Sequence, residues 1–265
     1  MHSGERLFPH SNDVLNLMIK FIDVHKSFGR QHVLRGVNLE IENGKTTAIM
    51  GKSGSGKSVL LKHIIGLLKP DSGQVLVDDL DLTKMKDKEL NQIRKKFGML
   101  FQDAALFDSL TVGENVAFPL REHTRLTEDE IGKTVAERLR AVGLSDIEAK
   151  MSSELSGGMR KRVGLARAIA MHPHFVLFDE PTTGLDPVMT EAINQLIIET
   201  QKNFNLTCVV ISHDLGSIFK ISHNVAMLYE GQIIEYGTPT EIQASLNPVM
   251  TQFLSGSIEG PIKIV

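Results

Sequence analysis

The chain has 265 residues, of which 42% are hydrophobic and 23% charged, so it can bury a large core and its composition argues against disorder and low complexity. Lys and Arg total 29 against 32 for Asp and Glu, a net charge of −3, which argues against a nucleic-acid partner. Cys208 is the single cysteine and cannot form an intrachain disulfide, and no apolar run approaches the ~20 residues that a bilayer span needs. These features predict a folded protein of the cytosol.

The first part of the chain predicts a small antiparallel β subdomain. Residues 1–17 are polar and without periodicity, so we expect a flexible leader before the fold begins near Met18. Short apolar or alternating runs predict strands over 18–24 and 37–41, with a turn at 28–31. A further short strand over 46–50 has little polar alternation, as expected where both faces are covered.

A phosphate-binding loop follows that strand directly. Residues 51–58 read Gly-Lys-Ser-Gly-Ser-Gly-Lys-Ser, and a helix follows whose apolar positions at helical spacing are Leu60, Leu61, Ile64, Ile65 and Leu68. Backbone N–H groups of such a loop converge with the positive end of the helix dipole on one phosphate. Lys57 supplies a point charge for the β- and γ-phosphates, and the Ser58 hydroxyl can bind Mg²⁺. The alternative is a flexible glycine turn, which the placement between a buried strand and an amphipathic helix disfavours. The predicted nucleotide-binding residues here are Gly51, Ser53, Gly54, Ser55, Gly56, Lys57, Ser58 and Val59.

Two segments follow whose charge and periodicity indicate helices. Residues 84–96 are rich in Lys and Arg but also contain Asp87 and Glu89, so we interpret them as a solvated helical face and assign them no function. Residues 112–150 turn helical, with a cap at Thr127, acidic residues after it and a stop at Gly143. This predicts a helical subdomain over about 103–160, inserted into the main domain.

The second half of the chain predicts a mainly parallel sheet. Strands over 175–178, 207–211 and 225–228 alternate with a helix over about 188–203, which indicates an α/β fold with right-handed crossovers. The first of these strands leads into Asp179 and Glu180, at the edge where parallel sheets bind ligands. Asp179 fits a Mg²⁺ ligand and Glu180 a base that orients the attacking water, although solvated turn residues are the alternative for two acids at a strand end.

Residues 155–159, Leu-Ser-Gly-Gly-Met, open a helix over 160–171 and give a second anion-binding helix start. With this run, the phosphate loop and the acidic strand end, the sequence closely resembles the ABC (ATP-binding cassette) ATPase family, whose signature is Leu-Ser-Gly-Gly-Gln. The resemblance covers about residues 18–246. Met159 departs from that signature. The resemblance implies a P-loop ATPase that uses ATP and Mg²⁺ and works as a homodimer. In it, Ser156, Gly157 and Gly158 of one subunit close over the nucleotide held by another.

The same resemblance implies roles for further residues. Gln102 corresponds to the Q-loop, residues 181–186 to the D-loop with Asp186 near nucleotide, and His213 to the switch histidine, which we expect at the γ-phosphate. Phe28 lies where the family places an aromatic ring that stacks on adenine, with a core phenylalanine as the alternative. The resemblance thus implies that Glu180, His213, Lys57 and Gln102 are catalytic. It implies that Ser58, Gln102 and Asp179 bind the metal.

Residues 54–70, 100–112 and 154–165, with Val59 and Met159 as the distinguishing residues, resemble the MlaF-like (Mkl) group of this family. That implies a peripheral ATPase at the cytoplasmic face of the inner membrane, which energises phospholipid transport between inner and outer membranes. The implied partners are a membrane permease (MlaE-like), a STAS-fold subunit (MlaB-like) and a periplasmic lipid-binding subunit (MlaD-like). Two alternatives stay open, a cassette for another substrate such as amino acids and a non-transport, nucleotide-dependent ABC regulator.

Two apolar segments predict contacts with partners. The segment after Gln102 is expected to form part of a groove for a permease helix, with burial in the chain's own core as the alternative; its apolar residues are Leu106, Phe107, Leu110 and Val112. The tail over 247–265 is expected to contact a neighbouring subunit or a partner, with packing on its own cassette or fraying at the terminus as the alternative. Its apolar residues are Val249, Met250, Phe253, Leu254, Ile258, Pro261, Ile262, Ile264 and Val265.

Overall fold

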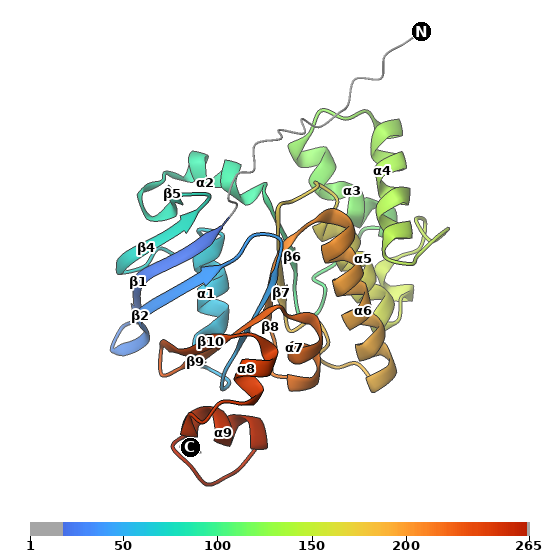
Figure 1. Ribbon diagram of the computed structural model, residues 1–265. Coiled ribbons are helices and arrows are strands. Elements are labelled where there is room, and N and C mark those ends of the chain that lie inside the picture. Colours follow the sequence, from blue (N-terminus) through green and yellow to red (C-terminus); the bar gives the residue numbers. More distant parts are fainter. Residues whose placement is uncertain (1–17, 264–265) are drawn as a thin grey trace.

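The structure is a computed structural model that describes residues 18–263. The leader expected over 1–17 lies outside the described residues, as do Ile264 and Val265. Two β-sheets and the helices around them make up the fold, and Figure 1 shows the antiparallel sheet on one side and the helices α3 and α4 on the other. The first sheet has the spatial order β2 (Gln31–Ile41), β1 (Ile19–Phe28), β4 (Ser72–Val77) and β5 (Leu80–Asp81).

The antiparallel β subdomain is therefore confirmed, although its strands are longer than the sequence predicts. Strand β1 continues through the polar residues after Val24 because main-chain pairing with β2 holds them, as in the pair Lys26 and Leu34. The strands β4 and β5 were not predicted from the sequence. The β1–β2 turn lies where it was expected, and Gly29 takes a left-handed φ of 60° there.

The second sheet has the order β10 (Gln232–Gly237), β9 (Asn224–Tyr229), β3 (Thr46–Met50), β8 (Thr207–Ile211), β7 (Phe175–Asp179) and β6 (Phe97–Leu100). Every neighbouring pair is parallel except β10 and β9, which confirms the mainly parallel sheet. All five residues of β8 are buried because both faces of the sheet are covered: Cys208 and Val210 pack on one side, Val209 and Ile211 on the other. Strands β6 and β10 were not predicted.

The helices are α1 (Lys57–Ile64), α2 (Asp87–Arg94), α3 (Val112–His123), α4 (Glu128–Ala141), α5 (Gly157–Ala168), α6 (Pro187–Phe204), α7 (Leu215–Ile221), α8 (Pro239–Gln243) and α9 (Pro248–Ser255), with 3₁₀ turns at Leu82–Lys84 and Ser152–Glu154. Helix α4 begins as predicted, because the Thr127 hydroxyl accepts a hydrogen bond from the Glu130 N–H and the Glu130 carboxylate accepts one from the Thr127 N–H. Helix α5 begins at Gly157 and ends at Ala168, whereas the sequence predicts 160–171, so both ends lie three residues earlier than predicted. Helix α1 stops at Ile64, so Leu68 lies beyond it.

The core positions the loop between β3 and α1. Leu60, Leu61 and Ile64 of α1 are buried in a cluster that also contains residues of the antiparallel sheet and one face of the parallel sheet. A second cluster joins the other face to α3, α4, α5 and α6. Because α1 is held between the two sheets and β3 is fully buried, the connecting loop has both ends fixed.

The C-terminal helix α9 packs on its own chain, which was the alternative for this segment. Met250 is fully buried, and Val249, Phe253 and Leu254 pack against the cluster that contains Ile218. The chain after α9 then returns to the end of β9, where the carbonyl of Pro261 accepts a hydrogen bond from the hydroxyl of Tyr229. A contact of this tail with another subunit stays a prediction.

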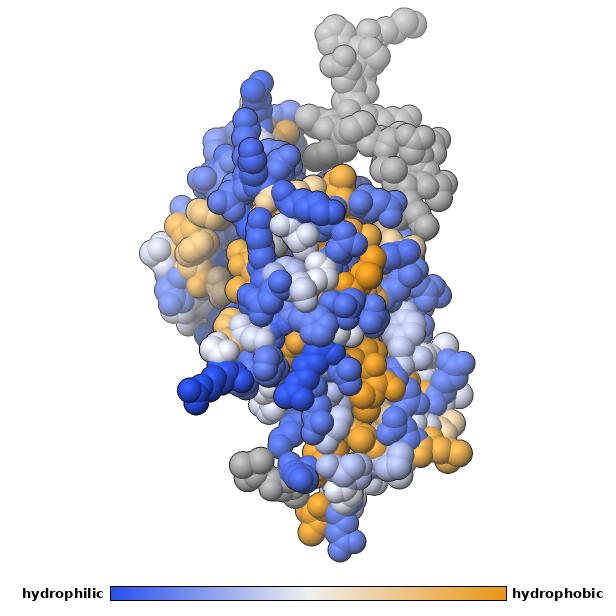
Figure 2. Space-filling model, turned by 90° about the vertical axis from the view of Figure 1, so that its left-hand side faces the viewer, coloured by the Kyte–Doolittle hydropathy of each residue, from blue (hydrophilic) through white to orange (hydrophobic). Residues whose placement is uncertain are grey.

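The side of the molecule that carries the antiparallel sheet is mostly hydrophilic, with apolar side chains in separate groups (Figure 2). Half-exposed apolar residues of the fold include Ile22, Phe28, Leu80 and Tyr236. Such isolated residues are ordinary on protein surfaces and by themselves indicate no partner. Within residues 18–263, the helices lack the length and hydropathy that a membrane span requires.

Gly98 of β6 gives a test of the contact between the parallel sheet and α5. A Cβ at this buried position would lie 2.2 Å from the backbone oxygen of Ala168, so we expect Gly98→Ala to lower the free energy of unfolding by about 1–3 kcal/mol. Gly132→Ala is the matched control, because that Cβ meets nothing within 4 Å and Ala is the better helix former by about 0.5–1 kcal/mol. Denaturant unfolding of both variants checks the opposite signs. Equal stability of the Gly98 variant and the parent protein would contradict this packing.

Candidate nucleotide-binding site

The loop over 51–58 joins the end of β3 to the start of α1 and depends on its glycines. Gly51, Gly54 and Gly56 have φ values of 153°, 76° and 105°, a region that side chains disfavour. At Gly51 a Cβ would also lie 2.3 Å from the carbonyl oxygen of Leu228. Because Gly56 is the N-cap of α1, no side chain of the cap residue covers the amides of the first helical turn. The loop therefore presents backbone N–H groups and a helix N-terminus, as a phosphate site requires.

Lys57 lies folded against this loop. Its Nζ donates hydrogen bonds to the carbonyls of Gly51, at 2.8 Å, and of Lys52, at 3.1 Å. Burial lowers the pKa of Lys57, whereas the nearby carboxylates of Glu180 and Asp179 raise it. The hydroxyl of Ser55 is buried and has no hydrogen-bond partner within residues 18–263. A phosphate bound here would offset the burial of the ammonium group, so the residues present fit a nucleotide phosphate.

A cavity of about 400 Å³ brings the predicted residues of this site together. It is lined by Phe28, Val33, Ser53, Gly54, Gly56, Lys57, Ser58, Val59, Gln102, Asp179, Glu180 and Ile211. Gly51 and Ser55 belong to the same loop but do not line the cavity. The ring of Phe28 is half-exposed, as a ring that stacks on a base must be, and not buried in the core.

The acidic end of β7 lies across the cavity from the loop. Burial and the neighbouring Glu180 raise the pKa of Asp179, because both disfavour its charged form. A bound cation would stabilise that charged carboxylate. Ser58, Gln102 and Asp179 line the same cavity and carry the oxygen ligands that Mg²⁺ prefers. These three residues could therefore hold the ion.

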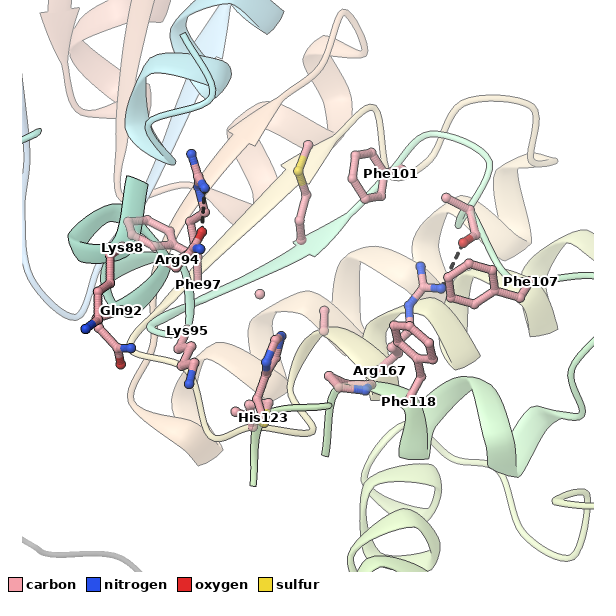
Figure 3. Close-up of a pocket in the computed structure, with 17 residues that line it drawn as sticks. Lys88, Gln92, Arg94, Lys95, Phe97, Phe101, Phe107, Phe118, His123 and Arg167 are labelled. Carbon is pink, nitrogen blue, oxygen red and sulfur yellow. Dashed lines mark hydrogen bonds between the residues drawn. The ribbon is translucent and has the colours of Figure 1, made fainter. Parts of the chain in front are cut away.

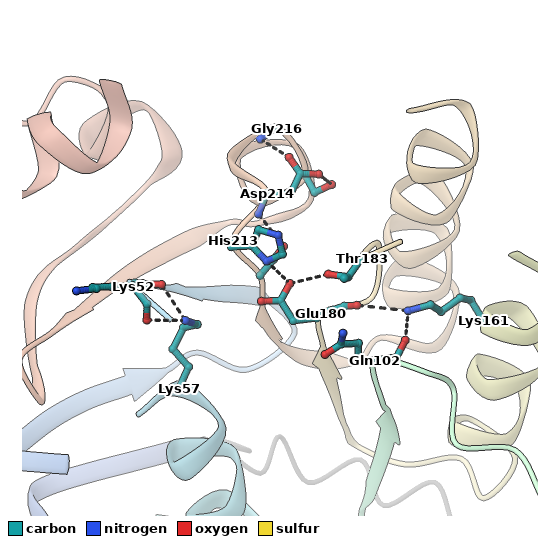
Figure 4. A network of polar contacts seen from close by, with 12 residues as sticks. Lys52, Lys57, Gln102, Lys161, Glu180, Thr183, His213, Asp214 and Gly216 are labelled. Carbon is teal, nitrogen blue, oxygen red and sulfur yellow. Dashed lines mark hydrogen bonds and ion pairs between the residues drawn. The ribbon is translucent and has the colours of Figure 1, made fainter. Parts of the chain in front are cut away.

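Glu180 is held by groups from several elements. Its backbone has a left-handed φ of 51°, and its N–H donates to the carbonyl of Ile211 at 2.9 Å. Its carboxylate accepts a hydrogen bond from the Thr183 hydroxyl at 3.0 Å and lies 2.8 Å from Nδ1 of His213 (Figure 4). His213 thus joins the site through Glu180, although it does not line the cavity. A carboxylate fixed in this way can orient a water molecule and accept its proton.

The signature residues lie elsewhere in the same chain. Ser156 caps α5 and accepts a hydrogen bond from the N–H of Met159, and Gly157 lines a separate cavity. Asp186 caps α6 and accepts hydrogen bonds from two backbone amides there. Met159, where the family has Gln, is partly buried against the helical core, so its side chain serves packing. The structure does not bring Ser156, Gly157 or Asp186 to the cavity of Lys57.

A larger groove of about 730 Å³ lies between α2, β6, α3 and α5 (Figure 3). Phe101, Phe107 and Phe118 line it with half-exposed rings, and the rings of Phe107 and Phe118 are 4.9 Å apart. The guanidinium of Arg167 lies 5.9 Å from the Phe107 ring and donates hydrogen bonds to the carbonyls of Ala104 and Ala105. The groove combines aromatic surface with positive charge.

Two predictions bear on this groove. The basic segment over 84–96 was interpreted as a solvated helical face, and Lys88 is indeed exposed, while Lys88, Arg94 and Lys95 also line the groove. Val112 was expected to line it, yet it is fully buried, because it begins α3 and packs in the helical core.

Phe107 does line the groove, whereas Leu106 and Leu110 are half-buried outside it.

Sequence reasoning missed two residues that contact Glu180. Thr183 bonds the Glu180 carboxylate, and the ammonium of Lys161 donates hydrogen bonds to the backbone carbonyls of Gln102 and Glu180. Lys161 follows the signature by two residues, which was the available signal. A lysine in a helix is ordinarily exposed, so its residue type gave no indication of burial.

Comparison with known proteins agrees with this geometry. The family described as "ABC transporter" matches residues 34–183. The chain is 42% identical over 248 residues to the probable ribonucleotide transport ATP-binding protein mkl of Mycobacterium leprae, covering 94% of this chain and 72% of that protein. It is 43% identical over 235 residues to the intermembrane phospholipid transport system ATP-binding protein MlaF of Haemophilus influenzae, covering 89% of each.

A solved structure of an ATP-binding cassette, a dimer in a post-hydrolysis state bound to ADP and Pi, is similar with a TM-score of 0.76 and 34% identity. The match covers 83% of this chain and 98% of that one.

Glu180→Gln tests the role of the carboxylate. The amide is nearly isosteric but cannot accept a proton from water, so we expect ATP binding to persist while hydrolysis falls by about 10²-fold or more. Steady-state phosphate release and direct ATP titration measure the two effects separately. Glu199→Gln, at an exposed position on α6, is the matched control and should hydrolyse ATP at the parent rate. A Glu180 variant with parent turnover would remove the assignment.

Proposed function

The chain belongs to the ABC transporter family, and on this basis we propose that it is the ATP-hydrolysing subunit of a transporter of the Mla type. It would energise phospholipid movement between inner and outer membranes through a permease partner. The observation that carries the ATPase function is the cavity that unites Lys57 and its loop with Asp179 and Glu180. The MlaF relative, similar over nearly the whole chain, supports the phospholipid cargo.

In the proposed reaction the loop amides and Lys57 bind the phosphates of ATP, while Phe28 stacks on the adenine. Ser58, Gln102 and Asp179 would hold Mg²⁺, which neutralises phosphate charge when it is bound. Glu180 orients the attacking water and takes its proton. Nδ1 of His213 lies 2.8 Å from the Glu180 carboxylate and helps to hold it in place.

The homodimer supplies the groups that one chain lacks. Ser156 and Gly157 do not line the cavity of Lys57 in the same chain, and Ser156 at the start of α5 offers a second anion-binding helix end. We infer that this helix end and Asp186 meet the nucleotide of the other subunit. The dimeric, ADP-bound relative supports this arrangement.

The aromatic groove is the proposed docking site for a helix of the permease. Its half-exposed rings and basic rim offer both apolar contact and charge to an amphipathic helix. The resemblance further supports a MlaB-like STAS-fold partner and a MlaD-like periplasmic partner, with this chain at the cytoplasmic face of the inner membrane. The mkl relative carries a ribonucleotide name, so the cargo has to be tested directly.

Mixed dimers test the shared site. Combining Lys57→Ala chains with Ser156→Arg chains gives heterodimers in which one site carries both lesions and the other is intact, so we expect about half of the parent hydrolysis per heterodimer if the sites act independently. Each single-variant homodimer, with a lesion in both sites, should be inactive. Phosphate release from the separated heterodimer is the measurement. Inactive heterodimers would mean that Lys57 and Ser156 of the same chain serve one nucleotide.

Phe107→Glu tests docking and cargo together. We expect this variant to fold and bind ATP but to lose its permease, because a carboxylate replaces apolar contact in the groove. Affinity purification from native membranes, followed by identification of co-purifying proteins and lipids, is the measurement. Leu246→Glu, at a highly exposed position away from the groove, is the control and should still co-purify with the permease and the phospholipid. Co-purification of nucleotides or amino acids in place of phospholipid would refute the proposed cargo. Recovery of the permease with Phe107→Glu would refute the docking site.

A further inference from the structure

Lys161 of α5 is a buried lysine whose ammonium group lies between two backbone segments. Lys161 is 5% exposed, and its Nζ donates hydrogen bonds to the carbonyls of Gln102 and of Glu180, the latter at 3.4 Å (Figure 4). These carbonyls lie 59 positions before and 19 positions after Lys161 in the chain. One side chain therefore connects the Q-loop to the catalytic segment.

Burial of this charge requires compensation. Removal from water lowers the pKa of Lys161, and the carboxylates of Asp103 and Glu180 act in the opposite direction. A lysine is rarely buried unless its ammonium group is paired, because removing the charge from water costs free energy that only such partners offset. Its two carbonyl partners and the nearby carboxylates supply that pairing.

The contact with Glu180 bears on the catalytic carboxylate. Glu180 has a left-handed backbone, which a residue with a side chain adopts only when surrounding contacts hold it. Its N–H is bound to the carbonyl of Ile211, and its own carbonyl accepts hydrogen bonds from the N–H of Thr183, at 3.3 Å, and from Lys161. Lys161 thus helps set the backbone from which the carboxylate projects.

The contact with Gln102 bears on the aromatic groove. Phe101 precedes Gln102 and lines the groove, as does Ala105. Arg167, six positions after Lys161 on α5, holds the carbonyls of Ala104 and Ala105. Helix α5 therefore holds this segment at two points, and the Lys161 point also reaches Glu180.

We propose that Lys161 is a positioning residue that ties the backbone of Gln102 to that of Glu180, so that a displacement of the groove segment reaches the catalytic carboxylate through it. The proposal rests on ATP hydrolysis by this chain. Lys161 touches no reacting group itself. It acts by keeping Gln102 and Glu180 in a fixed relation across the cavity of Lys57.

A pair of variants of equal length tests the proposal. Lys161→Gln keeps N–H donors, whereas Lys161→Met removes them, and both side chains are one bond shorter than lysine. We expect the kcat of ATP hydrolysis to fall about 10-fold or more in the Met variant and less than about 3-fold in the Gln variant, with ATP affinity kept in both. Lys133→Met, at an exposed site on α4, is the control and should match the parent protein.

Hydrogen exchange of the full chain provides the readout that a merely structural lysine would not give. In the Met variant, amide exchange should rise in residues 101–107 and 180–184 together, while the remainder of α5 stays protected. If the Met variant fails to fold, Lys161→Asn replaces it, because its amide is two bonds shorter than lysine and cannot reach both carbonyls.

Three outcomes would overturn the proposal: parent kcat in the donor-free variant, equal losses in the Gln and Met variants, or a loss of ATP affinity that accounts for the loss of rate. Failure of the parent protein to hydrolyse ATP would instead refute the proposed function, so the two failures are distinguishable.

Discussion

The parallel pairing of β3, β8 and β7 is the constraint on which the site depends. Strand β8 lies between the other two, so the phosphate loop after β3 and the two acids after β7 leave the sheet at the same edge, about 10 Å apart by two strand spacings. That separation places Lys57 and Glu180 on opposite sides of one cavity. Both faces of the sheet are buried, so neither segment can shift without disturbing the core.

Helix α5 joins features that the sequence presents as separate. Its first residue, Gly157, belongs to the signature, and the side chain of Ser156 caps its N-terminus. Lys161, one turn later, contacts the backbone carbonyls of Gln102 and Glu180, and Arg167 supports the wall of the aromatic groove. The close approach of its backbone to Gly98 seats the same helix on β6. A single helix thus links the signature residues, the backbone of Glu180 and the groove.

The groove also shows why overall charge is a poor guide to local surface. The chain carries a net charge of −3, yet Lys88, Arg94, Lys95 and Arg167 gather around aromatic rings in one place. Their positions follow from the packing of α2 and α5 on either side of β6. The charges of α2 are mixed in sign along the sequence, but Lys88 and Arg94 line the groove whereas Asp87 and Glu89 do not.

The sequence by itself determined the local chemistry of this protein. The phosphate loop, the buried strand that ends in Asp179 and Glu180, and the Thr127 cap are short-range patterns, in which neighbouring residues carry the physical requirement. Tertiary structure decided the strands β4 and β6, because they pair with β1 and β7, which are distant in the chain. Strands β5 and β10 instead close tight hairpins with β4 and β9, a local feature that the sequence analysis missed. Tertiary structure likewise decided the burial of Val112 and of Lys161, because burial depends on what packs against a helix face and not on the residue type.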